Sequence, residues 1–80
     1  MSFRTTVYID LRPVAEGQGT TARGAYEAAL EALRGCGYAN FASRLDEDAG
    51  MAELTGGTFT SFILGRPVEV RTQGSAAPGR

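Results

Sequence analysis

The sequence contains no histidine, no lysine and no tryptophan, and it contains a single cysteine. Histidine is the side chain used most often for acid–base catalysis near neutral pH, and it is also the commonest metal ligand. Its absence excludes most familiar hydrolase sites. We therefore expect a protein that is not an enzyme and that holds no cofactor or metal ion.

The single cysteine, Cys36, has no partner for an internal disulfide, which suits a reducing cytosol. It lies between two glycines directly after a predicted helix, where the negative end of the helix dipole disfavours a thiolate. No histidine is present to act as its base. We interpret Cys36 as a small, buried or semi-buried thiol and not as a nucleophile.

A strong net charge and a long apolar run are also missing. Nine acidic residues against eight arginines give a formal net charge of −1, so the chain lacks the basic excess that drives general nucleic-acid binding. No apolar stretch approaches the roughly 20 residues needed to span a bilayer, and the first ten residues lack the apolar run of a signal peptide. These absences predict a cytoplasmic protein without a membrane partner.

Residues 3 to 12 alternate with a period of two, which predicts a half-buried strand. Its inner side is expected to carry Phe3, Thr5, Val7, Ile9 and Leu11, and its outer side Arg4, Thr6, Tyr8, Asp10 and Arg12. Pro13 is expected to end the strand, and residues 15 to 20 contain two glycines without periodicity, which predicts a loop. The pair Gly17-x-Gly19 does not complete a dinucleotide-binding fingerprint, so we interpret it as part of that loop.

Helical periodicity replaces the alternation at about residue 22. Apolar residues at positions 22, 26, 29, 30 and 33 lie on one stripe, which predicts a helix over residues 22 to 34 that a threonine caps. Residues 38 to 45 fit two patterns, because a weak alternation favours a short strand while Phe41 and Leu45 also fit one helical face. We expect the strand.

The last third of the chain predicts a hairpin. Residues 58 to 64 and 67 to 72 are rich in β-branched and aromatic side chains, and Gly65-Arg66 between them suits a type II′ turn. The predicted fold is α+β: one helix on a small three- to four-stranded, largely antiparallel sheet, in the order β-α-β-β-β, with a partial ferredoxin-like arrangement. Residues 1 to 72 form one domain, and residues 73 to 80 form a disordered tail.

Two candidate surfaces for a macromolecular partner follow from this pattern. Acidic side chains cluster after the predicted third element, at Asp46, Glu47, Asp48 and Glu53, without the ligand spacing of a calcium loop. They are interpreted as a solvated turn or as a contact for a basic partner. The other surface is the outer side of the first strand with Arg4, Tyr8 and Arg12, since aromatic residues and arginine are enriched in interface hot spots. Asp10 on the same side is expected to pair with Arg12 or Arg71.

Three segments resemble small ferredoxin-like proteins, the group that includes the CRISPR adaptation nuclease subunit and certain ribonuclease antitoxins. These are the strand that ends near Asp10, the helix that closes on LRGCGY, and the segment LTGGTFTSFILG. The second helix of that fold has no counterpart among the predicted elements. The resemblance implies an alternative function as a degenerate nuclease or a toxin–antitoxin component, with Asp10 as the strand-end acid. A small homodimeric structural protein is a further alternative.

As a whole, the chain also resembles the small phage-encoded anti-CRISPR proteins that act on a type I surveillance complex, type I-C being the favoured subtype. The resemblance implies a non-enzymatic inhibitor in the host cytoplasm. It would bind protein subunits of the crRNA-guided surveillance complex and block the binding of target DNA, without direct sequence-specific contact to nucleic acid. We expect a monomer or a weak homodimer.

Overall fold

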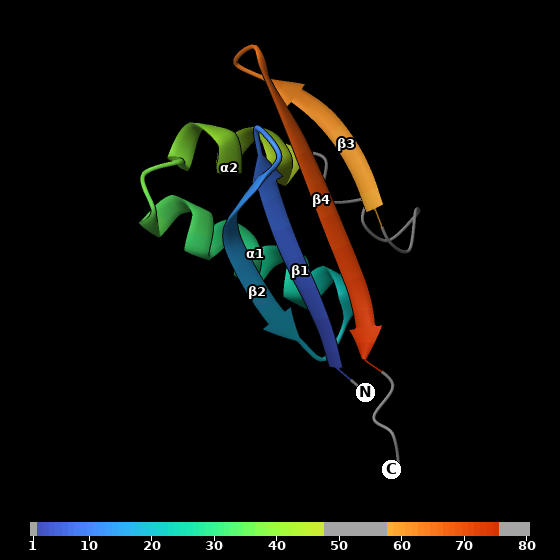
Figure 1. Cartoon of the computed structure of the whole chain (residues 1–80). Coiled ribbons are helices and arrows are strands. Elements are labelled where there is room, and N and C mark those ends of the chain that lie inside the picture. The colour runs from blue at the N-terminus through green and yellow to red at the C-terminus, as the bar shows by residue number, and fades with distance from the viewer. Residues whose placement is uncertain (1, 48–57, 76–80) are drawn as a thin grey trace.

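Two β-hairpins enclose a pair of helices along the chain. The elements are β1 (Ser2–Ile9), β2 (Arg12–Gly19), α1 (Ala22–Gly35), α2 (Ala39–Glu47), β3 (Thr58–Ile63) and β4 (Arg66–Ser75). The computed structural model describes residues 2–47 and 58–75. All neighbouring strands are antiparallel, in the sheet order β2-β1-β4-β3, and both helices lie on one side of the sheet (Figure 1). The α+β class is therefore confirmed.

The order of the elements differs from the predicted β-α-β-β-β. The chain reads ββααββ, so each hairpin is complete before or after the helices, and the first and last strands pair in the middle of the sheet. This order also differs from the β-α-β-β-α-β of ferredoxin-like folds. Two segments account for the difference, because each has a secondary structure other than the one we predicted.

The first is β2, which the sequence analysis interpreted as a loop. β1 and β2 pair from Phe3↔Gly19 to Ile9↔Arg12, with a β-bulge beside Val7 and Tyr8. Pro13 is tolerated because β2 is an edge strand, where one side of the backbone needs no ladder partner. Glycine and proline have low strand propensity, and this composition concealed the strand.

The glycines of β2 have a packing role. A Cβ atom on Gly17 would lie 2.1 Å from the backbone nitrogen of Ala29, and one on Gly19 would lie 2.7 Å from that of Ala25. Ala25 and Ala29 are fully buried. Helix α1 therefore lies directly on the backbone of β2, and the prediction that Gly17 and Gly19 belong to a loose loop is wrong.

The predicted helix over residues 22 to 34 is confirmed as α1. The hydroxyl of Thr21 accepts a hydrogen bond from the backbone N–H of Gly24 at 2.9 Å, which caps the first turn. The helix ends at Gly35, and Gly37 follows with a φ of 89°, a left-handed conformation that favours glycine. Tyr26, Leu30 and Leu33 are buried against the sheet and α2.

The second difference is α2, since residues 38 to 45 form a helix and not the strand we expected. Phe41, Ala42 and Leu45 are buried, which is the i, i+1, i+4 spacing of one helical face. The hydroxyl of Tyr26 donates a hydrogen bond of 2.5 Å to the Leu45 carbonyl oxygen, so α1 holds the end of α2. Packing against α1 decided an ambiguous pattern in favour of the helix.

The predicted second hairpin is confirmed as β3 and β4, but its turn is one residue earlier than expected. Leu64 and Gly65 occupy the two central positions, with φ angles of 53° and 76°. Two positive φ angles are the mark of a type I′ turn, so the predicted type II′ turn at Gly65-Arg66 is wrong. β4 continues to Ser75, so residues 73 to 75 belong to the sheet and not to a disordered tail. Residues 76 to 80 lie outside the described residues.

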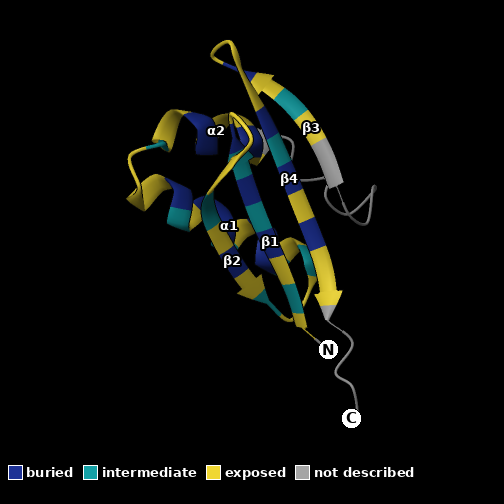
Figure 2. Cartoon of the chain, in the orientation of Figure 1, coloured by how far each residue is buried: buried dark blue, intermediate teal, exposed yellow. Residues whose placement is uncertain are grey.

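The core lies between the helices and one face of the sheet (Figure 2). The inner side chains of the central strands are buried, and among them the hydroxyls of Thr5 and Thr72 share a hydrogen bond of 2.9 Å. Within residues 2–47 and 58–75, neither helix has the length and apolar character needed to cross a bilayer. Neither of the two described helices lies on the other face of the sheet.

Candidate binding face

We call the helix-free side of the sheet the open face. The register of the three strand pairs decides its membership, because residues directly opposite each other point to the same side. Its side chains include Arg4, Thr6, Tyr8, Glu16, Gln18, Thr60, Phe62, Pro67, Glu69, Arg71 and Gln73. The open face thus presents side chains from all four strands.

The charges on the open face form pairs within the chain. Arg4 Nε lies 3.8 Å from a carboxylate oxygen of Glu16, and Arg71 Nε donates to Glu69 Oε2 at 2.6 Å. The Arg71 guanidinium also stacks over the Tyr8 ring, 5.0 Å from its centroid. The hydrogen bond to Glu69, then the negative charge of Glu69, raise the pKa of Arg71. The polar part of this face is consequently close to neutral.

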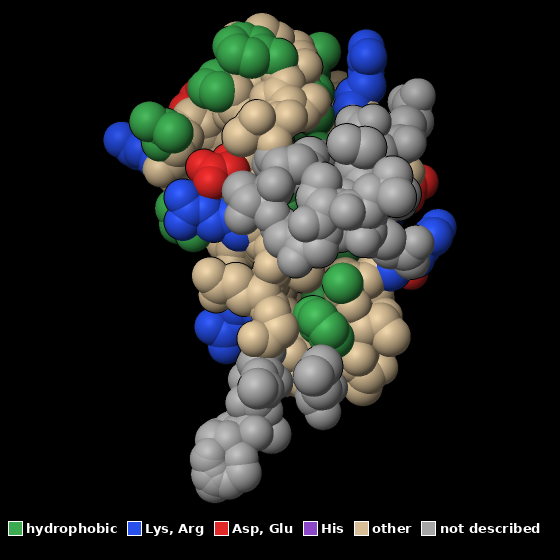
Figure 3. All heavy atoms as spheres, turned by 90° about the vertical axis from the view of Figure 1, so that its right-hand side faces the viewer, with side chains coloured by type: hydrophobic (Ala, Val, Ile, Leu, Met, Phe, Trp, Pro, Cys, Tyr) green, Lys and Arg blue, Asp and Glu red, His purple; other side chains and the backbone are tan. Residues whose placement is uncertain are grey.

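One end of the open face is apolar. Phe62 is 74% exposed, Leu11 is 82% exposed, and Leu64 in the neighbouring turn is 60% exposed. Hydrophobic side chains gather at the end of the molecule where the β3–β4 turn lies (Figure 3). Large apolar side chains with this exposure are uncommon as a group and mark interaction sites.

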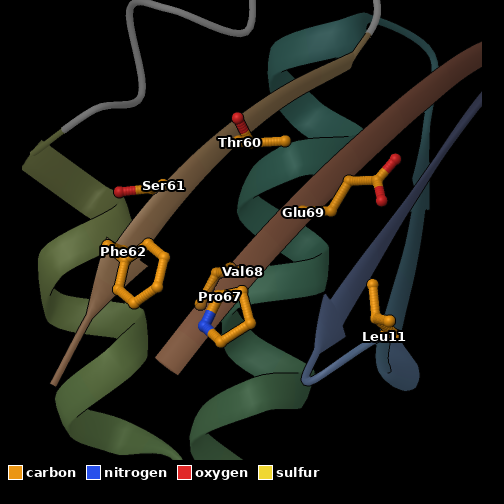
Figure 4. A pocket seen from close by; sticks show the side chains of 7 residues that line it. All are labelled: Leu11, Thr60, Ser61, Phe62, Pro67, Val68 and Glu69. Carbon is orange, nitrogen blue, oxygen red and sulfur yellow. The ribbon is translucent and has the colours of Figure 1, made fainter. Parts of the chain in front are cut away.

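A groove of about 370 Å³ opens at this apolar end. Phe62 and Pro67 stand on one side of it and Leu11 on the other, and Glu69 lies further along β4 with its carboxylate directed away from Phe62 (Figure 4). A second, polar hollow of about 380 Å³ lies at the opposite end of β1, beside Arg4, Gln18 and Gln73. The groove combines apolar walls with one carboxylate.

The two hairpin turns next to the groove are tied together. The carboxylate of Asp10 accepts hydrogen bonds from Arg66, one of them from Nε at 2.8 Å, and the Asp10 backbone N–H donates to the Pro67 carbonyl oxygen at 3.0 Å. The hydrogen bond and charge of Asp10 raise the pKa of Arg66. The prediction that Asp10 pairs with Arg12 or Arg71 is therefore wrong, since its ion pair is with Arg66.

The structure keeps only two of the three predicted first-strand residues together. Arg4 and Tyr8 lie on the open face, but Arg12 is opposite Ile9 and shares the side of the sheet that faces the helices. The alternation stops because Asp10 and Leu11 form a turn with φ angles of 54° and 68°. Leu11, which the alternation placed in the core, is for the same reason exposed.

Two residues of the predicted acidic cluster, Asp46 and Glu47, belong to α2, which lies on the helix side of the sheet. Asp46 is exposed near the end of α2 and Glu47 is the last residue of that helix, whereas Asp48 and Glu53 lie outside the described residues. The described part of the chain contains no group of three or more cysteine, aspartate or glutamate side chains that is close enough to hold a metal ion. Cys36 is exposed at the end of α1, where the chain turns away from the core, so the prediction of a buried or semi-buried thiol is wrong.

None of the residues that line the groove, which include Leu11, Phe62, Pro67 and Glu69, was predicted as a site residue. Phe62 alternates with Ile63 in a strand that is apolar on both sides, so only the register with β4 shows which side is exposed. A usable signal was present in the turn, because leucine beside aspartate is an unusual composition for a tight hairpin. No protein-family model, no curated protein and no solved structure matches the chain.

Proposed function

We propose that this chain is a non-enzymatic inhibitor that binds protein subunits of a CRISPR crRNA-guided surveillance complex through the open face and blocks its binding to target DNA. The choice of partner follows from the resemblance to small phage-encoded anti-CRISPR proteins. The choice of surface is carried by one observation, the apolar end of the open face with Phe62 and Leu11. An uncovered apolar patch with a polar surround is typical of a protein-binding site.

The charges of the open face favour a protein partner over a nucleic acid. Binding to nucleic-acid phosphates depends on arginine or lysine side chains that replace counterions. Here Arg4 and Arg71 are each paired with a glutamate of the same face. Tyr8 is covered by the Arg71 guanidinium, so it is not a free stacking platform for a base.

The test is inhibition of target binding by a purified type I-C surveillance complex, measured by electrophoretic mobility of labelled target DNA. The unchanged protein is expected to abolish the shifted band. Phe62→Asp places a carboxylate in the apolar end and is expected to weaken inhibition by about tenfold or more, as for a hot-spot residue. The matched control is Asn40→Asp, which adds the same charge at an exposed position of α2. Target binding that persists at saturating protein would contradict the proposal.

The acidic residues are the other candidate contact of the same inhibitor. Asp46 belongs to α2, which lies on the other side of the sheet from the open face, so we treat the two as separate contacts. We expect charge reversal at Asp46, Glu47 and Asp48 to leave inhibition within about twofold of the unchanged protein, because rim charges act mainly on association rates. A larger loss that grows at low salt would assign the contact to the acidic residues instead.

A nuclease function through Asp10 is the alternative that the sequence raises. Two groups of Asp10 already contact β4. Its carboxylate accepts from Arg66, and its backbone N–H donates to the Pro67 carbonyl oxygen. We therefore expect no cleavage when the protein is incubated with labelled RNA or DNA and Mg²⁺ or Mn²⁺. Cleavage that Asp10→Ala abolishes would replace the inhibitor proposal with an enzymatic one.

A further inference from the structure

We propose that the groove between Phe62 and Leu11 binds a lysine or arginine side chain of the protein partner, with the aliphatic part between the apolar walls and the charged group on Glu69. This inference rests on the proposed function, because it needs a protein at the open face. It goes further by naming the chemistry that the partner must present. Three features of the groove carry it.

The first feature is the pair of apolar walls. Phe62 on β3 stands beside Pro67, its partner in the register with β4, and Leu11 faces them from the β1–β2 turn (Figure 4). Phe62 and Leu11 are 74% and 82% exposed, so a ligand reaches them without rearrangement. Walls of this kind suit the methylene stem of a long basic side chain, which buries carbon while its charged end remains polar.

The second feature is the cost of placing leucine at position 11. Its φ of 68° lies in the left-handed region, where a residue with a Cβ is disfavoured, and it occupies the second central position of its turn, which favours glycine. Burial does not offset this cost, because the side chain is exposed. Strained residues of this kind concentrate at functional sites, and a contact outside the chain gives Leu11 a role.

The third feature is Glu69, the one charged residue among the described side chains that line the groove. Its Oε2 accepts from Arg71 Nε at 2.6 Å, and Arg71 is itself held by the Tyr8 ring. A carboxylate has about four acceptor sites, so this bond orients Glu69 and leaves it able to accept from a second donor. The Glu69 side chain is only 23% exposed, which strengthens its interaction with a cation relative to a fully solvated carboxylate.

These features discriminate between classes of ligand side chain. Arg71 already balances the charge of Glu69, so the ligand is selected by the remaining acceptor sites of this carboxylate and not by net charge. An acidic side chain has no proton to donate to these sites, and a purely apolar one covers them without a hydrogen bond, which costs free energy. A basic side chain packs against the walls and donates to the carboxylate, and the exposed Phe62 ring adds a cation–π surface. These requirements together select a basic anchor.

The experiment is a nuclear magnetic resonance titration of the labelled protein with four blocked pentapeptides, Ac-Gly-Ala-Xaa-Ala-Gly-NH2, in which Xaa is arginine, lysine, norleucine or glutamate. We expect millimolar binding of the arginine and lysine peptides, with shifts confined to the amides around Leu11, Phe62 and Glu69. Norleucine keeps the aliphatic stem without the charge, and the norleucine peptide is expected to bind at least about fivefold more weakly than the arginine peptide.

Variants of the protein complete the test. Glu69→Gln and Leu11→Gly are each expected to lower the affinity for the arginine peptide by about fivefold or more. Leu11→Gly relieves the left-handed strain, so loss of folding does not explain its effect. The control is Glu31→Gln, which alters an exposed glutamate of α1 away from the open face and leaves binding unchanged.

Equal binding of the norleucine and arginine peptides, preference for glutamate, shifts away from the groove, or an unaffected Glu69→Gln variant would each overturn the inference. These outcomes are separable from failure of the proposed function. If the groove binds basic peptides but the surveillance complex is not inhibited, the groove stands and the partner is wrong. If inhibition is observed without basic-peptide binding, the function stands and the groove chemistry is wrong.

Discussion

At the scale of single residues, small differences in side-chain volume decide how this sheet and its helix meet. Gly17 allows the backbones of β2 and α1 to approach closely, since its missing Cβ would lie 2.1 Å from the Ala29 nitrogen. Gly35 at the end of α1 is the opposite case, because a Cβ there meets no atom within 4 Å. Gly17 is therefore required by packing, whereas Gly35 is not.

Gly17→Ala is expected to lower the free energy of unfolding by about 3 kcal/mol, because α1 must move away from β2 and the core loosens. Gly35→Ala is the matched control and is expected to leave stability unchanged or to raise it by about 0.5–1 kcal/mol, since alanine favours a helix. Urea denaturation followed by circular dichroism measures both. A Gly17→Ala variant as stable as the unchanged protein would show that β2 and α1 do not pack as described.

At the scale of elements, α2 depends on α1 for its position. Phe41, Ala42 and Leu45 bury one face of α2, the Tyr38 ring meets Phe41 edge-on at 5.6 Å, and the Tyr26 hydroxyl binds the Leu45 carbonyl oxygen. α2 has nine residues, and a helix this short is marginal in isolation. Its stability must come from these contacts.

Tyr26→Phe is expected to destabilise the protein by about 1–2 kcal/mol, because it removes the buried hydrogen bond from the Tyr26 hydroxyl to the Leu45 carbonyl oxygen. Relative to the unchanged protein, the Tyr26→Phe variant should show a larger increase in amide hydrogen exchange in α2 than in β1 or β4. Tyr38→Phe serves as the control, since it keeps the ring contact with Phe41 and its hydroxyl makes no hydrogen bond to a described residue. If amide exchange became faster by the same factor in every element, the Tyr26 hydroxyl would not stabilise α2 in particular.

At the scale of the whole molecule, the sheet divides the protein into two unlike sides. The helices and the core occupy one side, and the open face with its paired charges and one apolar end occupies the other. The first and last strands form the centre of the sheet, so the fold is completed by contacts between the two ends of the chain. Binding through the open face leaves this core undisturbed.

We expect the free protein to be a monomer at micromolar concentration. A stable homodimer needs about 800 Å² of complementary surface from each copy, and the apolar part of the open face is confined to one end. Sedimentation velocity of the unchanged protein and of Phe62→Asp should give the same mass. A dimer that Phe62→Asp dissociates would show that the apolar end pairs with its own copy.

The sequence alone determined the elements whose patterns are local and strong. The alternation after residue 2 specifies β1, the apolar stripe and the threonine cap specify α1, and the β-branched segments around Gly65 specify the second hairpin. The positions of Arg4 and Tyr8 on the outer side of β1 follow from the same alternation. Each of these features depends on residues close together in the chain.

Tertiary contacts decided the rest. β2 is a strand because β1 supplies its hydrogen-bond partners and α1 covers its glycines, and α2 is a helix because α1 buries Phe41 and Leu45. The groove joins Leu11 to Phe62 and Glu69, which are more than fifty residues further along the chain, through the β1–β4 and β3–β4 pairings. Local sequence carries no information about which distant segment will pair, so the candidate site was predicted only in its first-strand part.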